Sequence, residues 1–324
     1  MKTILITGAA GFIGSHLSER LLERGDSVVG IDNFNDFYSP AMKRDNLSAA
    51  QQHPNFILRE GDICEPDFVH DVFSETRPDV VVHLAARAGV RPSLQNPALY
   101  HQVNVIGSQN ILDNCITRRP SHLVFASSSS VYGGSTEIPF TEDNPVTRPI
   151  SPYAATKRMN ELMGHVYHHV HGLKITFLRF FTVYGPRQRP DMAIHKFTRM
   201  IHEDQPIPMF GDGSTKRDYT YIDDIIDGVE RAIDKPLEYE ILNLGEHHTT
   251  SLSELIRLIA AASGKDPVIN RKPLQPGDVL ITYASIDKAR QLLGYTPRFG
   301  MEEGIQRFVQ WYRERLPALT EKNH

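Results

Sequence analysis

The sequence is poor in cysteine and has no long apolar run. Two cysteines, Cys64 and Cys115, occur among its 324 residues. We expect both to be small buried apolar residues in a reducing cytoplasm, because two cysteines do not build a disulfide framework. No apolar segment approaches the ~20 residues that a membrane-spanning helix needs. A strand-like run already begins at residue 3, so we expect no signal peptide and a cytoplasmic location.

An excess of charge of one sign is also missing. The 35 Lys and Arg residues are balanced by 39 Asp and Glu residues, the net charge is −4, and no basic run stands out. A nucleic-acid-binding surface is therefore not expected. Among the 15 histidines the densest cluster is His168, His169 and His171, which has no Glu or Cys beside it. We therefore predict no metal site.

A glycine-rich turn follows the first apolar run, residues 2–7. It contains Gly8, Gly11 and Gly14, and apolar residues at helical spacing begin immediately afterwards. Gly8 can turn with positive φ, Gly11 lets the backbone approach phosphates, and Gly14 allows close packing of helix on strand. Unpaired N–H groups at a helix N-terminus favour an anion. The pattern predicts a strand, a turn and a helix that hold a pyrophosphate, although an ordinary glycine-rich turn also fits the triplet.

An acidic residue ends the second apolar run. Residues 27–31 are expected to form a strand that leads directly into Asp32, about 20 residues after the glycine turn. A carboxylate at this position accepts hydrogen bonds from ribose hydroxyls and repels a 2′-phosphate, which favours NAD over NADP. Lys43 and Arg44 lie further on and leave the choice of cofactor open.

Strands and helices alternate through the first half of the chain. Further strands are expected at residues 56–59, 79–84, 122–126 and 174–181, and helices at 41–52, at 98–118 and from 151. This alternation predicts an α/β fold with a doubly wound parallel sheet, the Rossmann architecture. Asp62 and Ile63 follow the third strand, and Ala85 and Ala86 follow the fourth. All four are therefore expected at the edge of the sheet where ligands bind.

The composition changes after Thr182, where proline, glycine and arginine cluster in residues 184–190. We therefore expect an NAD-binding domain at 1–182 and a smaller α/β substrate-binding region mainly at 183–318, with some chain interleaving. Residues 319–324 are expected to be a tail.

Tyr153 and Lys157 lie four residues apart on the helix that opens at Ser151 and Pro152. Both side chains therefore share one helix face, and the preceding strand ends in the serines 127–130. Tyrosine is a poor base at neutral pH, but a lysine ammonium and a bound nicotinamide cation both favour its phenolate. The phenolate can take the proton of a substrate alcohol while hydride leaves for NAD, and a serine can relay that proton. A tyrosine that only packs its ring, beside a surface lysine, is the alternative.

The sequence resembles extended short-chain dehydrogenases/reductases of the NAD-dependent epimerase/dehydratase family along nearly its whole length. The resemblance rests on residues 7–14 (TGAAGFIG), 83–86 (HLAA), 151–157 (SPYAATK) and 217–224 (RDYTYIDD). It implies NAD as the cofactor and Ser128, Tyr153 and Lys157 as the catalytic set, with Ser129 as the less favoured alternative to Ser128. The cofactor-binding residues that it implies are Gly8, Ala10, Gly11, Phe12, Ile13, Gly14, Asp32, Asn33, Asp62, Ile63, Leu84, Ala85, Ala86, Tyr153, Lys157 and Phe180.

The resemblance also narrows the reaction. Related 4,6-dehydratases carry an Asp-Glu pair directly after the catalytic hydroxyl residue, and related sugar-acid decarboxylases carry a Glu two residues after it. Those positions are Ser129 and Ser130 here, so no acid is available for elimination. Oxidation and re-reduction at one carbon remain, which is C4 epimerisation of a nucleotide sugar through a transient 4-keto intermediate. The enzyme class is then isomerase, and NAD is regenerated in the site.

Residues 179–193 (RFFTVYGPRQRPDMA) are similar to the corresponding segment of UDP-glucuronate 4-epimerases. An arginine and a hydroxyl can bind the uronate carboxylate, and we assign Arg189 and Thr182 to it. A firm hold would also protect the 4-keto intermediate, a β-keto acid, from losing carbon dioxide. A solvated basic loop is the alternative interpretation of Arg187 and Arg189.

The resemblance implies further contacts and a second copy of the chain. The substrate-binding residues are expected to be Ser128, Ser129, Tyr153, Thr182, Arg189, Arg217 and Asp278. Arg87 stands where glucuronate epimerases often have Gln. The helices that begin near Ala98 and Ser151 imply a homodimer, while no nucleic acid or membrane is expected as a partner. The alternatives are a 4-epimerase of neutral or N-acetylated UDP-hexoses, and a non-catalytic NAD or nucleotide-sugar binding protein.

Overall fold

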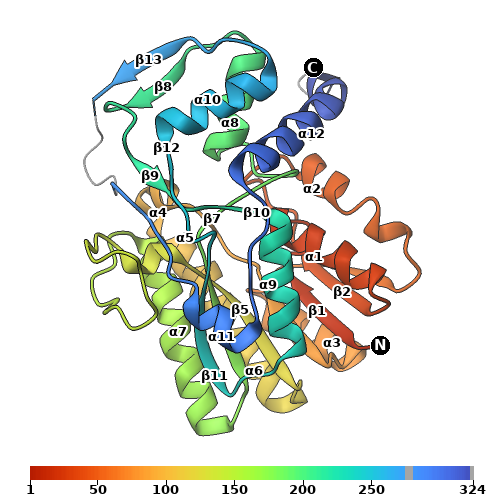
Figure 1. Ribbon diagram of the computed structural model, residues 1–324. Coiled ribbons are helices and arrows are strands. Elements are labelled where there is room, and N and C mark those ends of the chain that lie inside the picture. The colour runs from red at the N-terminus through yellow and green to blue at the C-terminus, as the bar shows by residue number, and fades with distance from the viewer. Residues whose placement is uncertain (274–279, 322–324) are drawn as a thin grey trace.

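A parallel sheet of seven strands forms the centre of the fold (Figure 1). The computed structural model describes residues 1–273 and 280–321. The strand order is β11-β6-β5-β4-β1-β2-β3, and all neighbours are parallel. The strands are β1 (Thr3–Thr7), β2 (Ser27–Asp32), β3 (Phe56–Glu60), β4 (Val80–His83), β5 (His122–Ser128), β6 (Ile175–Phe180) and β11 (Tyr239–Leu244). The order reverses at β1, where a ligand crevice is expected, and the predicted doubly wound sheet is confirmed.

Helices cover both faces of this sheet (Figure 1). In β1 the side chains of Ile4 and Ile6 belong to one hydrophobic core and that of Leu5 to the other, and all three are fully buried. The first core is covered by α1 (Phe12–Glu23) and α9 (Ile222–Asp234). The second is covered by α3 (Pro66–Thr76), α6 (Ser108–Arg118) and α7 (Pro152–His171). Burial on both faces explains the near-continuous apolar runs from which the strands were predicted.

The helix expected at 98–118 consists of three consecutive segments. A π-helical stretch, η2 (Gln102–Gly107), connects α5 (Pro97–His101) to α6. This stretch carries Asn104, whose side chain accepts a hydrogen bond from the backbone N–H of Arg87 (2.7 Å) and donates one to its carbonyl (3.0 Å). The irregular turn therefore ties the helix to the loop after β4, a placement typical of π-bulges at functional sites.

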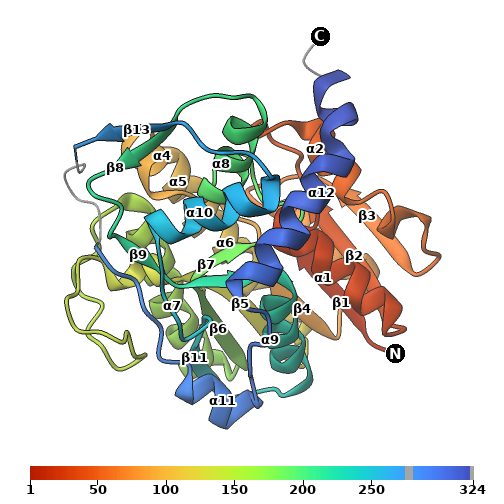
Figure 2. The same cartoon turned by 45° about the horizontal axis from the view of Figure 1, so that its top comes forward.

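A smaller region lies beyond the carboxyl ends of the central strands (Figures 1 and 2). It contains helices that pack on one another and the short strand pairs β7–β10, β9–β12 and β8–β13. Its elements are β7 (Thr182–Tyr184), α8 (Ala193–His202), β8 (Ile207–Phe210), β9 (Lys216–Arg217), β10 (Tyr219–Tyr221), β12 (Thr250–Ser251), α10 (Leu252–Ser263), β13 (Ile269–Lys272) and α12 (Met301–Glu321). Within the range 183–318, α9, β11 and α11 (Asp287–Leu293) pack with the central sheet instead, so the chain passes between the two parts. The helix α12 continues past the expected boundary at 318.

The remaining elements are short helical segments. They are α2 (Pro40–Asn46), η1 (Ala50–Gln52), α4 (Val90–Gln95) and η3 (Ser129–Tyr132). The helix expected at 41–52 is thus divided into α2 and η1. The residues between them, 47–49, leave the helical path after the C-cap at Leu47.

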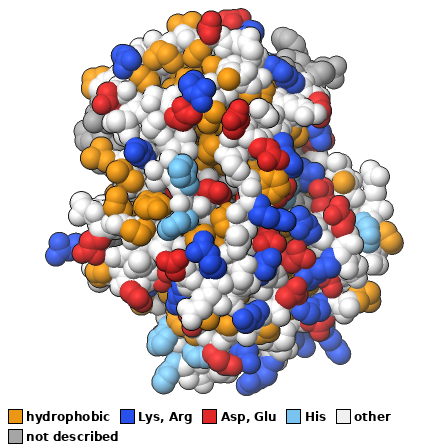
Figure 3. Space-filling view, viewed as in Figure 1, with side chains coloured by type: hydrophobic (Ala, Val, Ile, Leu, Met, Phe, Trp, Pro, Cys, Tyr) orange, Lys and Arg blue, Asp and Glu red, His pale blue; other side chains and the backbone are white. Residues whose placement is uncertain are grey.

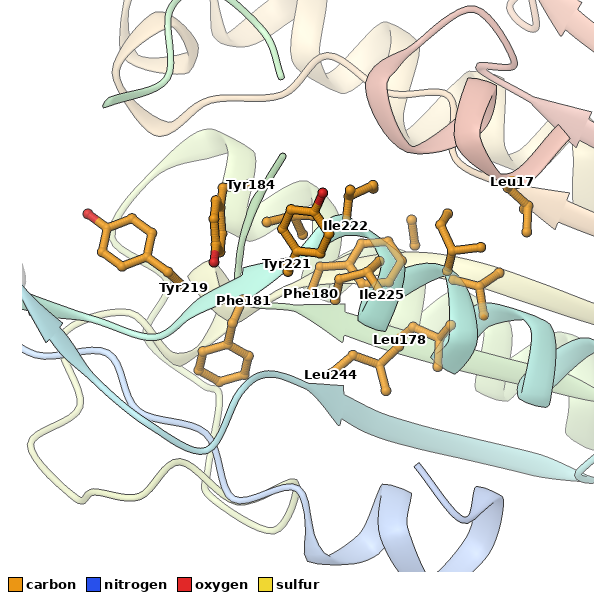
Figure 4. Packing of buried hydrophobic residues seen from close by; sticks show 14 of the residues in the cluster. Leu17, Leu178, Phe180, Phe181, Tyr184, Tyr219, Tyr221, Ile222, Ile225 and Leu244 are labelled. Carbon is orange, nitrogen blue, oxygen red and sulfur yellow. The ribbon is translucent and has the colours of Figure 1, made fainter. Parts of the chain in front are cut away.

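Aromatic side chains fill the junction between the sheet and the smaller region (Figure 4). Phe180 and Phe181 follow one another at the end of β6, and Tyr184, Tyr219 and Tyr221 come from the β7–β10 pair; all five are buried. The ring centres of Tyr184 and Tyr221 lie 5.5 Å apart, edge to face. This packing fixes β7, which follows directly from the central sheet, relative to the smaller region.

Several sequence expectations concern the molecule as a whole. Cys115 is fully buried, but Cys64 is only half-buried and its thiol donates to the Gln102 carbonyl (3.6 Å). No helix among the described residues is long and apolar enough to cross a membrane. In the same residues, no group of three His, Cys, Asp or Glu side chains could hold a metal ion. Acidic and basic side chains are intermixed on the face shown in Figure 3.

Candidate active site

A pocket of about 430 Å³ opens at the carboxyl ends of the central strands. It extends from the turn after β1, past the ends of β4 and β5, to β7 and the loop that follows it. The predicted site residues that line it are Gly8, Gly11, Phe12, Ile13, Gly14, Asp32, Asn33, Asp62, Ile63, Leu84, Ala85, Ala86, Ser128, Ser129, Tyr153, Lys157, Phe180, Thr182 and Arg189. Ala10 and Arg217 do not line it, and Asp278 lies outside the described residues.

The glycine turn leaves no room for side chains. Gly8 has φ +72°, and a Cβ there would lie 2.8 Å from the backbone nitrogen of Ala85. A Cβ on Gly14 would lie 2.2 Å from the carbonyl oxygen of Gly8. Gly11 is the N-cap of α1, and no described side chain caps that end of the helix. Backbone N–H groups at the start of α1 are therefore free to hold an anion such as a pyrophosphate.

Asp32 is held firmly at the end of β2. Its two carboxylate oxygens accept hydrogen bonds from the backbone N–H groups of Ala10 (3.1 Å) and Phe34 (2.9 Å). Ala10 therefore contributes by orienting Asp32. Arg44 is engaged by both oxygens of Glu60 (2.8 and 3.1 Å), so its charge is already paired. An oriented carboxylate beside a neutralised arginine favours a ribose diol over a 2′-phosphate.

A second polar contact lies at the end of β3. The side-chain amide of Asn33 donates to Asp62 (2.8 Å), and the other oxygen of Asp62 accepts the backbone N–H of Cys64 (2.8 Å). These bonds lower the pKa of Asp62 although its partial burial alone would raise it. Together with the glycine turn and Asp32, this wall fits a dinucleotide: an anion site, an acid for the ribose and a second polar edge.

The three predicted catalytic residues lie together in the middle of the pocket. Ser151 caps α7, its hydroxyl accepting the N–H of Ala154 (3.1 Å), and so directs the first turn of the helix toward the end of β5. Burial raises the pKa of Tyr153, while a hydrogen bond with Ser128 and the positive charge of Arg189 lower it. We expected the charge of Lys157 to lower the pKa of Tyr153; in the structure the lowering charge is that of Arg189, and burial keeps the pKa above its usual value.

Lys157 faces the same part of the pocket from the next turn of α7. Its Nζ donates to the carbonyl of Ala126 (2.8 Å), and the side chain is 3% exposed. Burial lowers the pKa of Lys157 to about 8, against the opposing charge of Glu161. The ammonium therefore exchanges protons near neutral pH, as a group in a proton relay should.

A buried ion pair that the sequence analysis did not identify supports this centre. Glu161 is fully buried one turn after Lys157, and it accepts hydrogen bonds from Ser127 Oγ (2.7 Å) and from Nε and Nη2 of Arg179 (2.8 and 2.9 Å). It therefore joins α7, β5 and β6 directly beneath Ser128 and Phe180. The signal in the sequence is a charged residue, Arg179, inside an otherwise apolar strand.

Arg189 and Thr182 both line the pocket. Its Nε and Nη2 donate to the two oxygens of Asp191 (2.9 and 2.8 Å). Its Cζ lies 5.2 Å from the ring centre of Phe37. The guanidinium is thus held from two sides, which a solvated basic loop would not require.

The other predicted arginines have different surroundings. Arg187, in the same loop as Arg189, donates to both oxygens of Glu19 on α1 (2.9 and 3.1 Å) and does not line the pocket. Arg187 therefore fastens the loop to the helix of the glycine turn. The guanidinium of Arg217 instead donates hydrogen bonds from Nη1 to the backbone oxygens of Lys216 (2.8 Å) and Leu280 (3.4 Å).

The segment after Asp32 supplies pocket residues that the sequence analysis missed. They are Asn35, Phe37, Tyr38 and Lys43. Lys43 donates to the backbone oxygen of Asn35 (2.8 Å) and lies over the Tyr38 ring (5.0 Å). Two adjacent aromatic residues in a polar stretch were the available signal, because an exposed loop has little use for them.

The family of the chain is shown by comparison with known proteins. Residues 5–308 match the GDP-mannose 4,6 dehydratase family. The chain belongs to this family. The resemblance to extended short-chain dehydrogenases/reductases that the motifs indicated is thereby confirmed, although Ser129 and Ser130 stand where 4,6-dehydratases are expected to carry acids.

Relatives with stated activities match along almost their whole length. The UDP-glucuronate 4-epimerase of Thermodesulfobacterium geofontis is 43% identical over 320 residues, which cover 98% of both chains. The crystal structure of UDP-glucuronic acid 4-epimerase from Bacillus cereus, in complex with UDP-glucuronic acid and NAD, has a TM-score of 0.90 at 36% identity and covers 96% of this chain and 99% of its own. UDP-glucose 4-epimerase from Thermotoga maritima, with UDP-glucose, has a TM-score of 0.88 at 33% identity, covering 97% and 99%.

Proposed function

We propose that the protein interconverts UDP-glucuronate and UDP-galacturonate by NAD-dependent epimerisation at C4. At the coarser level it is a UDP-sugar 4-epimerase, an isomerase that uses NAD, as its relatives are. The choice of the uronate rests on one observation above all: Arg189 and Thr182 line the same pocket as Tyr153, and the charge of Arg189 lowers the pKa of Tyr153. A guanidinium and a hydroxyl suit a carboxylate through charge-assisted hydrogen bonds.

Different groups of the chain would bind different parts of NAD. The N–H groups at the start of α1 would hold the pyrophosphate, and Asp32 would hold the adenosine ribose. NAD, when bound, accepts the C4 hydride and returns it to the opposite face of the sugar. Phe180, Leu84 and the small residues Ala85 and Ala86 line the remaining pocket wall.

Proton transfer falls to the central trio. Tyr153 takes the proton of the C4 hydroxyl and gives it back when the 4-keto sugar is reduced. Ser128, in hydrogen-bond contact with Tyr153, can relay that proton, with Ser129 as its neighbour at the same wall. Lys157 supplies positive charge and a proton-exchanging group behind them. The 4-keto uronate is a β-keto acid, and a carboxylate held by Arg189 keeps its carbon–carbon bond away from the geometry that releases carbon dioxide.

The second candidate is a 4-epimerase of neutral or N-acetylated UDP-hexoses. Asp191 already pairs with Arg189, which lowers the net charge of that wall, and a UDP-glucose 4-epimerase shares the fold. Arg217 and Asp278 are still predicted to contact the UDP part of either substrate.

Purified protein incubated separately with UDP-glucuronate, UDP-glucose and UDP-N-acetylglucosamine distinguishes these candidates. We expect the highest kcat/KM with UDP-glucuronate. Arg189→Gln should lower the ratio of kcat/KM for UDP-glucuronate over UDP-glucose by about 100-fold, the effect of losing one or two charge-assisted hydrogen bonds. Arg187→Gln, in the same loop but paired with Glu19, is the matched control and should leave the ratio unchanged. Conversion of the neutral sugars alone would select the second candidate.

We also propose a homodimer formed through α7. Four apolar side chains at helical spacing are exposed along this helix: Met159, Leu162, Val166 and Val170 (40–62% exposed). Such an exposed stripe is typical of a partner surface. Val166→Lys should lower the mass measured by light scattering to that of one chain, whereas Val268→Lys, at an equally exposed apolar residue elsewhere (56%), should not. A single-chain mass for the unchanged protein would contradict the dimer. The cytoplasmic location stays a prediction.

A further inference from the structure

Arg189 has two neighbours: Asp191 accepts hydrogen bonds from its Nε and Nη2, and its Cζ lies over the ring of Phe37. We propose that Asp191 and Phe37 are positioning residues that present one defined edge of the Arg189 guanidinium to the substrate. The preference for an acidic sugar would then depend on how these two residues hold Arg189. The inference rests on the proposed function and deepens it.

Asp191 determines which N–H groups remain for a ligand. A guanidinium carries five N–H donors in a fixed plane. Asp191 takes one from Nε and one from Nη2, and Nη2 also faces the thioether of Met192 (3.7 Å), a weak acceptor. Within the described chain, Nη1 is therefore the nitrogen whose two N–H groups stay available. Asp191 is more exposed than Arg189, 48% against 20% for the side chains, so the acid lies on the solvent side of the pair.

Phe37 determines the plane of the guanidinium. Its ring lies near two arginines, with its centre 5.2 Å from Cζ of Arg189 and 5.7 Å from Cζ of Arg87. A cation is attracted to the face of an aromatic ring at these distances. The backbone that carries the ring is restrained, because the N–H of Phe37 donates to the Asn35 side chain (3.1 Å), which Lys43 also binds (3.1 Å).

Arg87 is the second arginine near the Phe37 ring. Its backbone N–H and carbonyl are both bonded to Asn104 in the π-helical stretch (2.7 and 3.0 Å). Its guanidinium lies 3.8 Å from the exposed Asp36. The ring of Phe37 thus contacts an arginine whose backbone is hydrogen-bonded to the central fold. Through this ring, Arg87 also helps to fix the position of Arg189.

This arrangement explains selectivity as well as position. A bare guanidinium would bind any nearby acceptor, including a sugar hydroxyl. With its side edge occupied by Asp191, the guanidinium offers its end, where one N–H of Nη1 and the remaining N–H of Nη2 point the same way and match the two oxygens of a carboxylate. A neutral sugar gains little from that end, so loss of the positioning should affect the uronate far more.

Asp191→Asn and Phe37→Leu test the proposal, with kcat and KM measured for UDP-glucuronate and for UDP-glucose. Asp191→Asn keeps the size of the side chain but removes its charge and one acceptor. We expect each variant to lower kcat/KM for UDP-glucuronate about tenfold, mainly through KM. Asp191→Asn, at a residue outside the pocket lining, should change kcat/KM for UDP-glucose less than twofold. Phe37→Tyr keeps the ring and should restore the value. Asp287→Asn, at an exposed Asp–Arg pair far from the pocket, should change neither substrate.

A double-mutant cycle shows whether the two residues act through Arg189. In an Arg189→Gln background, Asp191→Asn and Phe37→Leu should cause no further loss of selectivity. Equal losses with both sugars, or an undiminished effect without Arg189, would overturn the positioning role while leaving the proposed function intact. If the unchanged protein converts UDP-glucose but not UDP-glucuronate, the proposed function itself fails, and this inference fails with it.

Discussion

Replacing the buried Glu161 by glutamine tests how much the ion pair beneath the catalytic residues contributes to stability. The carboxylate is fully buried, and it accepts two hydrogen bonds from Arg179, whose side chain is 1% exposed, one from Ser127 and one from Arg158, whose side chain is 27% exposed. Glutamine has nearly the same shape but carries no charge, so the arginine would keep a buried charge without its counter-ion. Breaking such a pair from one side costs about 3 to 5 kcal/mol.

Chemical denaturation at pH 7 measures this cost as the change in the free energy of unfolding. The matched control is Asp227→Asn, because Asp227 pairs with Arg231 one turn along the exposed side of α9 (2.6 Å). That change should cost no more than about 0.5 kcal/mol. The double variant Glu161→Gln with Arg179→Met should recover part of the loss, since it removes the unpaired charge. Equal costs for Glu161→Gln and Asp227→Asn would refute the reasoning.

The pH dependence supplies a second readout for the same pair. Burial alone would raise the pKa of Glu161, but the hydrogen bonds and charge of Arg179 outweigh it and lower the pKa below its usual 4.5. A carboxyl group whose pKa is lowered by folding stabilises the folded state above its unfolded pKa, and this contribution is lost as pH falls through the folded value. The difference in stability between the unchanged protein and Glu161→Gln should therefore be full above pH 4.5 and shrink below it.

Three further predictions concern activity. Tyr153→Phe should lower kcat by about 10²- to 10⁴-fold, the usual contribution of a general base, with NAD binding by calorimetry unchanged; unaltered turnover would rule out its role. Gly14→Ala should abolish NAD binding in the same assay because its Cβ would lie 2.2 Å from the Gly8 carbonyl oxygen, whereas Gly300→Ala, where nothing lies within 4 Å, should not; equal affinities would exclude the close contact. Since the pKa of Lys157 is about 8, kcat should fall as pH rises through that value and the ammonium is lost; a flat alkaline profile would contradict its charge being needed.

The main cofactor-binding and catalytic elements of the site could be predicted because the sequence patterns that indicate them are local. The glycine turn, Asp32 and the Tyr153–Lys157 spacing each lie within one element or one turn of the chain. The parallel sheet then brings these elements together at its carboxyl edge, as the alternation of strands and helices requires. The same rule placed Asp62, Ala85 and Ala86 correctly at the pocket.

The supporting contacts could not be predicted because they join segments that are distant in sequence. Glu161 and Arg179 are neighbours only once α7 packs on β6, and neither residue reveals its partner from periodicity. Phe37 meets Arg189 across more than 150 positions, in a loop with no regular pattern. The spacing of apolar residues also does not predict the π-helical stretch, because its altered geometry is fixed by the hydrogen bonds of Asn104 to another loop.

The most direct test of the account uses UDP-glucuronate that carries deuterium at C4, incubated with the purified protein in ordinary water. We expect UDP-galacturonate as the product, with the deuterium still at C4, because the same hydride leaves and returns within one turnover and Tyr153 moves only the hydroxyl proton. Loss of the label to solvent, or the absence of UDP-galacturonate while UDP-glucose is converted, would contradict the account.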